Sequence, residues 1–473
     1  MNLAGKHVLV LGLGESGLAS ACWCARQGAR VRVADTRTAP PYLSELRRRS
    51  VENSTSADSQ LEFIAGEFDK ALLDGIDLLV LSPGLSGGLM VVIHARAAGI
   101  PVVGEIELFA QGLRSLDKVA PLLAITGTNG KTTTTALTGH LLRATGKTVG
   151  VAGNISPAAL TALMDALDAD ALPQIWVLEL SSFQLETTET LNAAAATVLN
   201  ISDDHLDRYI DLDEYASAKA KVFQSAEGAP GVQVLNRDDS RVCRMTLPDR
   251  HIISFGLDAP AAEEDFGLRQ HRGEAWLAQG QRLLLPVSEL PLAGLHNAAN
   301  AMAALALCSA LGFDAEALLP ALRSFRGLPH RVEKVAEFGG VTWYDDSKGT
   351  NVGATVAALN GIGGLGCKIV VILGGDGKGQ DFSPLKAAVA RHARSAVLIG
   401  RDGPLIEKAI IGAGVAIENA SDMGDAVRRA RRRAQPGDAV LLSPACASFD
   451  MFRNYEHRAQ VFVAAVRALE SEA

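Results

Sequence analysis

Short apolar segments that end in glycine or polar turns alternate with longer amphipathic segments along the whole chain. This alternation is typical of β-α-β units, in which helices cover both faces of a parallel sheet. The pattern restarts near residues 105 and 328, and 473 residues are too many for a single hydrophobic core. We therefore predict an α/β protein of three domains, at residues 1–104, 105–327 and 328–473.

The first block begins with a predicted strand at 7–11 that leads into Gly12-x-Gly14-x-x-Gly17, and the next strand, 30–34, ends at Asp35. A glycine turn between strand and helix, with an acidic residue after the second strand, is typical of a Rossmann-like dinucleotide site. Alone it suggests NAD, but such a loop can also bind another nucleotide or only allow close helix packing. We predict a Rossmann-like domain with a nucleotide site of unspecified identity.

The second block contains the strongest local motif, Gly127-Thr128-Asn129-Gly130-Lys131-Thr132-Thr133, after a predicted strand at 122–126. Backbone N–H groups of such a loop bind phosphate oxygens at the N-terminus of the following helix. Lys131 would lie at the β- and γ-phosphates and Thr132 would offer its hydroxyl to Mg²⁺. Ile125 stands where a standard phosphate loop has its first glycine. The motif predicts a central ATP site of the P-loop type in a mostly parallel sheet with helices.

Polar residues follow further predicted strands of this block. Glu179 closes the strand at 175–180, and His205 follows the strand at 196–200. A carboxylate at the end of a parallel strand beside a phosphate loop is suited to hold Mg²⁺, although it could also belong to the acidic first turn of a helix. His205 could be structural or part of the site. By its spacing, Lys219 is a surface lysine of a helix.

The third block has loops of small and polar residues at 344–351, 374–379 and 443–449. The last two directly follow predicted strands at 368–373 and 438–442. Loops at the carboxyl ends of parallel strands form ligand sites, so we predict a Rossmann-like C-terminal domain with a substrate-binding rim. The residues of the rim do not identify which substrate binds there.

Charge and composition narrow the function classes. A net charge of −8 argues against nucleic acid, and the arginine clusters at 47–49 and 428–433 are expected on exposed helix faces. The six cysteines lack zinc-type spacing and predict reduced thiols in the cytoplasm. We expect no signal peptide, and no apolar run approaches the roughly 18 residues that a membrane span requires.

Several motifs together resemble the Mur ligase family over practically the whole chain. They are the phosphate loop, Glu179-Leu180-Ser181-Ser182, Asp204-His205-Leu206-Asp207-Arg208, Gly294-Leu295-His296-Asn297 and Gly327-Leu328-Pro329-His330-Arg331. Within the family, the third block resembles the members that add D-glutamate. This narrower likeness is carried by Asp346-Ser347-Lys348-Gly349-Thr350-Asn351, Ser443-Pro444-Ala445-Cys446-Ala447-Ser448-Phe449 and Asn454-Tyr455-Glu456.

The resemblance implies an ATP-dependent ligase of peptidoglycan precursor synthesis that adds D-glutamate to UDP-N-acetylmuramoyl-L-alanine through an acyl phosphate. It implies ATP and Mg²⁺ (two sites) as cofactors, a monomer, and neither nucleic acid nor membrane as partner. A Mur-type ligase for another amino acid is one alternative. An NAD-dependent oxidoreductase would leave the phosphate loop without a role, and a regulatory or transport ATPase would leave the third block without one.

The resemblance also implies a role for each matching residue. The catalytic residues would be Lys131, Asn154, Glu179, His205 and Lys219, with Lys219 as a carbamate. Mg²⁺ would be held by Thr132, Glu179, His205 and Lys219. ATP would be bound by Gly127, Thr128, Asn129, Gly130, Lys131, Thr132, Thr133, Asn297, Arg331 and Asp346. The UDP substrate would be bound by Gly14, Ser16, Gly17, Asp35, Thr36, Arg37, Ser82, Gly84, Asn154 and Ser181.

D-glutamate would be bound by Thr350, Lys378, Ser448 and Tyr455. Two residues depart from the familiar pattern of the family. Tyr455 stands in place of a phenylalanine, which keeps the ring and adds a hydroxyl, and Ser156 stands in place of a glycine.

Overall fold

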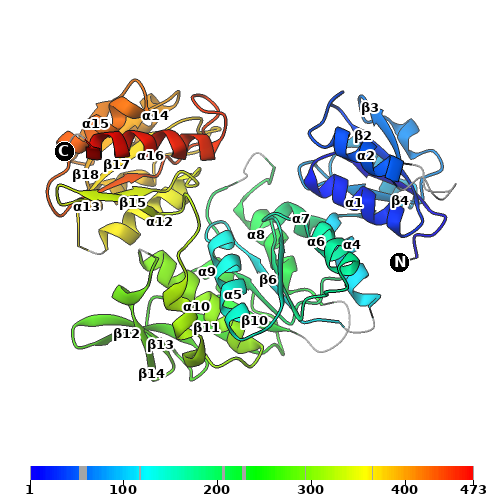
Figure 1. Ribbon diagram of the computed structural model, residues 1–473, viewed down its shortest axis with the longest axis horizontal. Coiled ribbons are helices and arrows are strands. Elements are labelled where there is room, and N and C mark those ends of the chain that lie inside the picture. Colours follow the sequence, from blue (N-terminus) through cyan, green and yellow to red (C-terminus); the bar gives the residue numbers. More distant parts are fainter. Residues whose placement is uncertain are drawn as a thin grey trace.

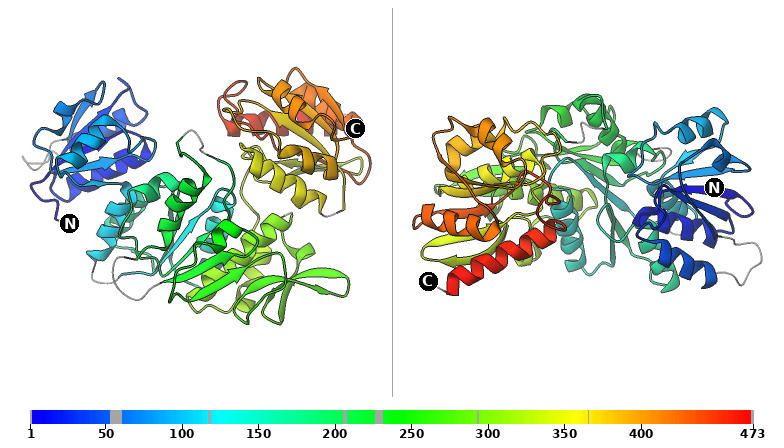
Figure 2. Two further views of the ribbon diagram at one scale, coloured as in Figure 1. Left: turned by 180° about the vertical axis from the view of Figure 1, so that it is seen from behind. Right: turned by 90° about the horizontal axis from the view of Figure 1, so that it is seen from above.

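The computed structural model describes residues 2–52, 61–116, 119–204, 208–225, 231–292, 294–364 and 366–471. The candidate site residue His205 lies outside these ranges. Three separate sheets with flanking helices confirm the predicted α/β class. The N-terminal and C-terminal sheets lie at opposite ends of the molecule, with the central sheet between them (Figures 1 and 2).

The N-terminal sheet is entirely parallel, in the order β3-β2-β1-β4-β5. Its strands are β1 (His7–Leu11), β2 (Arg30–Asp35), β3 (Leu61–Ala65), β4 (Leu78–Leu81) and β5 (Val102–Val103). Its helical elements are α1 (Glu15–Arg26), α2 (Leu43–Glu52), η1 (Lys70–Leu73) and α3 (Met90–Ala97). The central strands β1 and β4 are apolar on both faces because helices cover both sides of the sheet.

The central sheet has the order β14-β13-β12-β11-β10-β9-β6-β8-β7, parallel from β7 to β12 and antiparallel beyond. The strands are β6 (Leu122–Thr126), β7 (Val149–Gly153), β8 (Ile175–Glu179), β9 (Ala195–Val198), β10 (Val232–Asn236), β11 (Ile252–Phe255), β12 (Phe266–His271), β13 (Glu274–Gln279) and β14 (Arg282–Pro286). The α-helices are α4 (Glu105–Arg114), α5 (Lys131–Ala144), α6 (Ala159–Asp168), α7 (Ser182–Glu186), α8 (Leu212–Ala220), α9 (Ser240–Cys243), α10 (Leu295–Ala310) and α11 (Leu319–Ser324). The short 3₁₀ helices are η2 (Lys221–Phe223), η3 (Val287–Glu289) and η4 (Glu316–Leu318).

The C-terminal sheet has the order β15-β16-β20-β17-β18-β19 and is parallel except for the pair β15–β16. Its strands are β15 (Glu333–Phe338), β16 (Val341–Asp345), β17 (Ile369–Gly374), β18 (Ala393–Ile399), β19 (Ala416–Asn419) and β20 (Ala439–Leu442). Its helices are α12 (Val352–Gly363), α13 (Leu385–His392), α14 (Gly403–Ile410), α15 (Met423–Arg433) and α16 (Tyr455–Ser471). The cluster of arginines at 428–433 lies on α15, where Arg428 is exposed and Arg429 and Arg433 pair with acidic neighbours, as expected for a solvated face.

One hydrophobic core runs from the N-terminal sheet into the central sheet. It includes Val8 and Trp23 on one side and Phe109, Leu160 and Trp176 on the other. The rings of Phe109 and Trp176 meet edge to face, with centroids 5.2 Å apart. The interface is formed by α1, α4 and α6, which pack against one another. The C-terminal sheet, by contrast, packs its two faces into cores of its own.

A carboxylate is buried in this shared region. Glu105 begins α4, is 2% exposed, and its Oε1 accepts the backbone N–H of Leu160 at 2.6 Å. Its Oε2 has no hydrogen-bond partner among the described residues. Burial raises the pKa of Glu105 from 4.5 to about 7.

The raised pKa of Glu105 makes stability depend on pH. The folded state holds its proton more tightly than the unfolded state, so the stabilisation is complete below about pH 4.5 and is lost as pH rises through about 7. We expect the stability of the wild type relative to Glu105→Gln to fall by up to roughly 3 kcal/mol over this interval. Urea unfolding of both proteins at pH 5 and pH 8 measures the change.

Glu107 provides a matched control in the same helix. Although burial opposes the effect, hydrogen bonds from Thr190 and Gln111 lower the pKa of Glu107. The stability of the wild type relative to Glu107→Gln should therefore show the opposite trend and decrease as pH falls. Parallel pH profiles for the wild type and Glu105→Gln would contradict the expectation.

The C-terminal domain contacts the central domain through the linker and α12. A Cβ at Gly361 of α12 would lie 2.4 Å from Nδ1 of His296 in α10, so the absence of a side chain there permits close packing. Asn351, the N-cap of α12, has its Nδ2 3.4 Å from Oδ1 of Asn129 in the glycine loop. Within the described part of the chain, no helix is long and apolar enough to cross a membrane.

Candidate active site

The central glycine loop lies between β6 and α5, as predicted. Gly130 is the N-cap of α5 with φ of 84°, and a Cβ there would lie 2.4 Å from Oδ1 of Asn300, so only glycine fits. The Nζ of Lys131 donates to the carbonyl oxygens of Gly127 and Thr128, each at 2.9 Å. Burial lowers the pKa of Lys131, while the nearby carboxylates oppose this effect. The loop thus presents a cation and helix N–H groups, which suit a phosphate chain.

Backbone and side-chain bonds hold the loop against the segment that follows β9. The backbone N–H of Asn129 donates to Oδ1 of Asn200 at 2.8 Å, and the hydroxyl of Thr128 accepts the N–H of Ser202 at 3.0 Å. Thr133 is buried in the first turn of α5. These contacts fix the backbone of the loop.

Glu179 ends β8 beside this loop and is 2% exposed. Its Oε1 accepts the side-chain N–H of Asn154 at 2.8 Å, and its backbone oxygen accepts the N–H of Asn154 at 2.8 Å. Its Oε2 is buried without a hydrogen-bond partner among the described residues. A buried carboxylate oxygen that lacks a donor is the kind of ligand that Mg²⁺ takes.

Lys219 is buried, which contradicts its interpretation as a surface lysine. It lies at the end of α8 and is 1% exposed, with Nζ 3.5 Å from the hydroxyl of Thr126 and 4.5 Å from the Tyr215 ring centroid. Burial, and then the charge of Lys131, lower the pKa of Lys219 well below its ordinary value. The residue pattern of α8 did not predict this burial, because the helix is rich in alanine and its buried side has no clear apolar stripe. The site favours a neutral amine at this position.

Arg331 brings the linker of the C-terminal domain to the phosphate loop. Its Nη2 donates to the hydroxyl of Thr132 at 2.7 Å, and burial lowers the pKa of its guanidinium while Glu179 and Asp346 oppose the effect. The residues on either side of Arg331 have positive φ, 64° at His330 and 50° at Val332. A positive φ is strained for any residue other than glycine, so the surrounding structure must stabilise this conformation.

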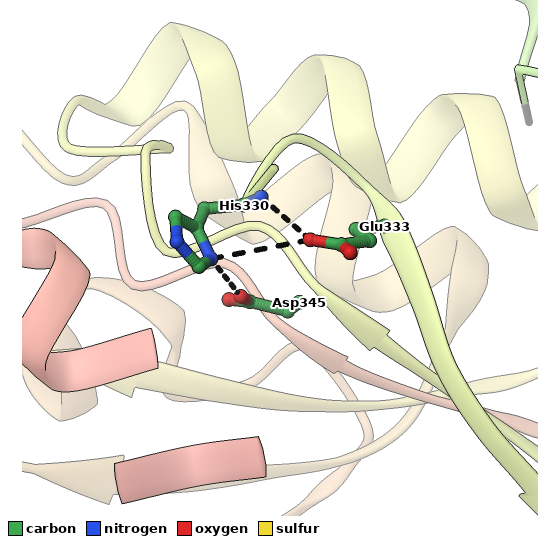
Figure 3. Close-up of side chains that lie close together, drawn as sticks. All are labelled: His330, Glu333 and Asp345. Carbon is green, nitrogen blue, oxygen red and sulfur yellow. Dashed lines mark hydrogen bonds and ion pairs between the residues drawn. The ribbon is translucent and has the colours of Figure 1, made fainter. Parts of the chain in front are cut away.

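A cluster of three side chains supplies that restraint (Figure 3). His330 Nδ1 lies 2.7 Å from Oδ2 of buried Asp345, and the backbone N–H of His330 donates to Oε2 of Glu333 at 2.8 Å. The carbonyl of His330 accepts the N–H of Lys348 at 3.2 Å. The cluster fixes the turn from which Arg331 reaches the phosphate loop, and the sequence motif alone did not predict this role for His330.

Two further residues expected around ATP lie on α10 and after β16. Asn297 is buried, and its Oδ1 accepts the side-chain N–H of Asn300, the residue that contacts Gly130. Asp346 is buried and accepts the hydroxyl of Ser443 at 2.7 Å. Burial raises the pKa of Asp346 to about 7. Both residues are thus connected to loops of the candidate site.

The N-terminal glycine loop has the tight packing that its motif predicts. A Cβ at Gly17 would lie 1.9 Å from the oxygen of Gly12, and the hydroxyl of Ser82 donates to that same oxygen at 2.9 Å. Asp35 accepts the N–H of Leu13 at 2.8 Å and two hydrogen bonds from the guanidinium of Arg37. The bonds from Arg37 lower the pKa of Asp35 to about 2. Asp35 therefore joins this loop to the loop that follows β2.

The remaining residues expected to contact the UDP substrate lie at the ends of other strands. Gly14 is the N-cap of α1, Ser16 lies in its first turn, and Thr36 and Gly84 are exposed in neighbouring loops. Ser181 is the N-cap of α7 and forms a capping box with Gln184. Its hydroxyl therefore already has a structural role in the central domain.

The three polar loops of the C-terminal domain are hydrogen-bonded to one another. The N–H of Ala445 donates to Gly349 at 3.0 Å, and that of Gly374 donates to Pro444 at 2.9 Å. Residues Asp376 and Ala447 form an isolated antiparallel bridge. These contacts follow from the neighbouring positions of β16, β20 and β17 in the sheet.

Three of the four residues expected to bind D-glutamate, Thr350, Lys378 and Ser448, lie in these loops. Ser448 is 2% exposed, Lys378 is exposed at a positive φ of 49°, and Thr350 is partly buried. Tyr455 begins α16, and its ring lies 3.9 Å from Nζ of Lys348. Burial raises the pKa of the Tyr455 phenol to about 12.

Two residues of this region were missed by sequence reasoning. Arg458 of α16 is fully buried and donates to the hydroxyl and carbonyl of Ser347 and to the carbonyl of Cys446. It thereby ties two of the loops to α16, although in sequence it is one of many helical arginines. Lys348 lies with its Nζ over the ring of Tyr455, and burial lowers its pKa. Its position two residues before Thr350 in the same loop was a clue available in the sequence.

Known proteins are similar in sequence to this chain over nearly its whole length. A family model described as Mur ligase MurD-like, N-terminal domain, matches residues 6–104; the Mur ligase middle domain matches 125–308; and the Mur ligase, glutamate ligase domain, matches 330–446. The UDP-N-acetylmuramoylalanine–D-glutamate ligase of Aromatoleum aromaticum is 59% identical over 473 residues, covering 99% of this chain and 98% of the relative. The enzyme of the same name from Thiobacillus denitrificans is 54% identical and covers 100% and 98%.

Solved structures with the same architecture have much lower identity. MurF from Acinetobacter baumannii matches with a TM-score of 0.61 at 17% identity, over 98% of this chain and 91% of its own. UDP-N-acetylmuramate-alanine ligase from Thermotoga maritima matches with a TM-score of 0.57 at 20% identity, over 98% and 99%. These likenesses show the three-domain α/β fold.

Proposed function

The chain belongs to the Mur ligase family, and from this premise we propose that it joins D-glutamate to UDP-N-acetylmuramoyl-L-alanine in an ATP-dependent reaction. The observation that carries the proposal is the 59% identity, over the full length of both chains, with a relative named for this reaction. The product is a precursor of peptidoglycan. In this reaction ATP is cleaved to ADP, and an amide bond forms between a carboxylate and an amine.

Activation of the carboxylate is the task of the central domain, residues 105–327. Attack of a carboxylate on the γ-phosphate brings two anions together, and Lys131 offsets part of their repulsion while the loop N–H groups hold the phosphates. Thr132, Glu179 and Lys219 offer the oxygen ligands that fit Mg²⁺, with Lys219 as a carbamate, and we propose two metal sites with His205 as a further ligand. When bound, Mg²⁺ supplies charge neutralisation at the phosphate oxygens.

The lowered pKa of Lys219 supports its modification, because only a neutral amine reacts with CO₂ to give a carbamate. An unmodified ammonium would place a positive charge beside the metal. Asn154 and Ser181 lie near Glu179 and are proposed to orient the substrate carboxylate. Asn297, Arg331 and Asp346 complete the ATP site from α10 and the linker.

The N-terminal domain, residues 1–104, is proposed to bind the UDP part of the substrate. The N-terminus of α1 and the loop of Gly14, Ser16 and Gly17 suit a diphosphate. Asp35, Thr36 and Arg37 would contact the nucleoside, and Ser82 and Gly84 would border the sugar side. This assignment leaves no role for a nicotinamide cofactor.

The C-terminal domain, residues 328–473, is proposed to bind D-glutamate with Thr350, Lys378, Ser448 and Tyr455. The amine of D-glutamate must lose a proton before it attacks the acyl phosphate. The positive charges of Lys131, Arg331 and Lys348 at the site favour that loss, because each of them destabilises a nearby ammonium. The same charges stabilise the tetrahedral intermediate that follows.

Replacing residues proposed to bind the carboxylates of D-glutamate is expected to raise the KM for D-glutamate and to leave the KM for ATP nearly unchanged. Lys378→Ala and Ser448→Ala should each raise the KM for D-glutamate about 10- to 100-fold, since each lost charge-assisted bond contributes roughly 1.5–3 kcal/mol. The KM for ATP should stay within about twofold. Initial rates over a D-glutamate titration measure the effect, and Lys386→Ala, an exposed lysine of α13, serves as the control. An unchanged D-glutamate KM would exclude these residues from the pocket.

The chain is further proposed to act as a cytoplasmic monomer. All six cysteines are free, and burial raises the pKa of the thiols of Cys24, Cys308 and Cys446, which fits inert thiols in a reducing compartment.

Substrate dependence tests the proposed function directly. ADP release should require both UDP-N-acetylmuramoyl-L-alanine and an amino acid, and among D-Glu, L-Glu, D-Asp and L-Lys only D-Glu should support full turnover. ADP release without either substrate would favour a regulatory or transport ATPase. A preference for another amino acid would keep the family and change the substrate.

A further inference from the structure

Two carboxylates from other helices cap the N-terminus of α6. Its N-cap residue, Ala158, has no side chain that could accept a hydrogen bond. Instead Oε1 of Glu15 accepts the hydroxyl of Ser156 at 2.6 Å and the N–H of Ala158 at 3.1 Å. Glu105 accepts the N–H of Leu160. The first N–H groups of a helix need such acceptors, so α1 and α4 determine where α6 begins.

Glu15 belongs to the N-terminal glycine loop itself. It is the first residue of α1, directly after the N-cap Gly14 and before Ser16. A carboxylate turned toward a bound diphosphate would be repelled by it. In this structure the carboxylate is turned to the 156–158 segment of the central domain, so the loop contacts the neighbouring domain through its acidic side chain.

The capped segment is continuous with the pair formed by Asn154 and Glu179. The N–H of Gly153 donates to the carbonyl of Pro157 at 3.1 Å and closes the turn, and Asn154 is bonded to Glu179 through both backbone and side chain. A Cβ at Gly153 would lie 2.3 Å from the backbone oxygen of Glu179. This close packing leaves little room for the turn to shift independently of β8.

We propose that Glu15 is a positioning residue that sets the offset between the N-terminal glycine loop and the Asn154–Glu179 pair. The inference rests on the proposed function, in which the substrate is anchored by its UDP at the first loop while its carboxylate reacts at the second. The distance between the two anchors then decides whether the carboxylate is aligned with the γ-phosphate. Glu15 acts through Ser156 and Ala158 and touches neither reacting group.

Glu15→Ala is expected to lower kcat about 10- to 100-fold, because small misalignments of reacting groups carry penalties of this size. The KM values for ATP and for the UDP substrate should change by less than about twofold. Glu15→Gln keeps an oxygen acceptor in the same place and should restore most of the rate. Hydrogen exchange of the peptide covering 154–160 should become faster in Glu15→Ala and stay near wild type in Glu15→Gln.

The other end of the same helix pair provides a matched control. Arg26 of α1 pairs with Asp168 of α6 at 2.5 Å, and Arg26→Ala should keep kcat within about twofold. The double variant Glu15→Ala/Ser156→Ala should be no slower than Glu15→Ala, because both changes remove one interaction.

A normal kcat in Glu15→Ala would overturn the inference, and so would an equal loss in Arg26→Ala, which would indicate general weakening of the interface. If the wild type itself lacks D-glutamate-dependent turnover, the proposed function fails. The exchange measurement then still decides whether Glu15 holds the 154–160 segment, and unchanged exchange in Glu15→Ala would reject that role.

Discussion

Lys131→Ala is expected to lower kcat by at least about 10³-fold while the chain remains folded. Lys131 is the cation of the phosphate loop, and its Nζ contacts only carbonyl oxygens of that loop, at Gly127 and Thr128, among its described partners. Loss of one preorganised charge at a developing phosphoryl charge has effects of this order. Single-turnover measurement of ADP formation reports the chemical step, and circular dichroism reports the fold.

Lys147→Ala is the control for this prediction, since Lys147 is an exposed lysine just beyond the other end of α5. It should be as active as the wild type. Calorimetry with a non-hydrolysable ATP analogue separates lost binding from lost chemistry. A folded Lys131→Ala protein with near-normal turnover would move the ATP site away from this loop.

Lys219→Ala is expected to lower kcat by at least about 10²-fold, and small carboxylic acids such as acetate should restore part of it. The physical reason is that a carbamate supplies a hard oxygen ligand, whose loss removes several kcal/mol of metal-dependent stabilisation. An added carboxylate can occupy the space that the side chain leaves. Activity of the wild type should also rise with bicarbonate.

Two observations separate this modification from a structural role of the buried lysine. Isotopically labelled bicarbonate should give a carbamate signal in the wild type that is missing in Lys219→Ala. Lys221→Ala, two residues further on and bonded through Nζ to the carbonyl of Glu186, should stay active and keep the signal. An active wild type whose Lys219 is unmodified at saturating bicarbonate would refute the prediction.

The strands that sequence reasoning located best are those at the centres of the sheets. The segments 7–11 and 122–126 were predicted to the residue, because each is almost entirely apolar and leads into a glycine turn. Several strands that were not predicted lie at sheet edges, namely β3, β5, β7, β14, β15 and β19, while β10 to β13 and β16 were missed inside their sheets. Edge strands are covered on fewer sides, so exposed polar residues interrupt the apolar pattern, as in β19.

The candidate site also has features that could be predicted from the sequence and features that could not. Glycine motifs such as Gly12-x-Gly14-x-x-Gly17 could be predicted because Gly12 has a positive φ of 86° and a side chain at Gly17 would clash with the oxygen of Gly12. The burial of Lys219 and the bond between His330 and Asp345 could not, because both depend on which segments meet in three dimensions.

Because the first two sheets share a hydrophobic core, the N-terminal domain cannot be separated from the central domain without exposing that core, unlike the C-terminal domain. Removing residues 1–104 would strip α1 from α4 and α6 and expose Phe109, Leu160 and their neighbours to water. The C-terminal sheet keeps its two cores when it is separated, so it can be exchanged at the linker without leaving such a surface. With D-glutamate bound by the C-terminal domain as proposed, new amino-acid specificity could be introduced by replacing that domain, whereas the N-terminal domain would have to be redesigned together with the central one.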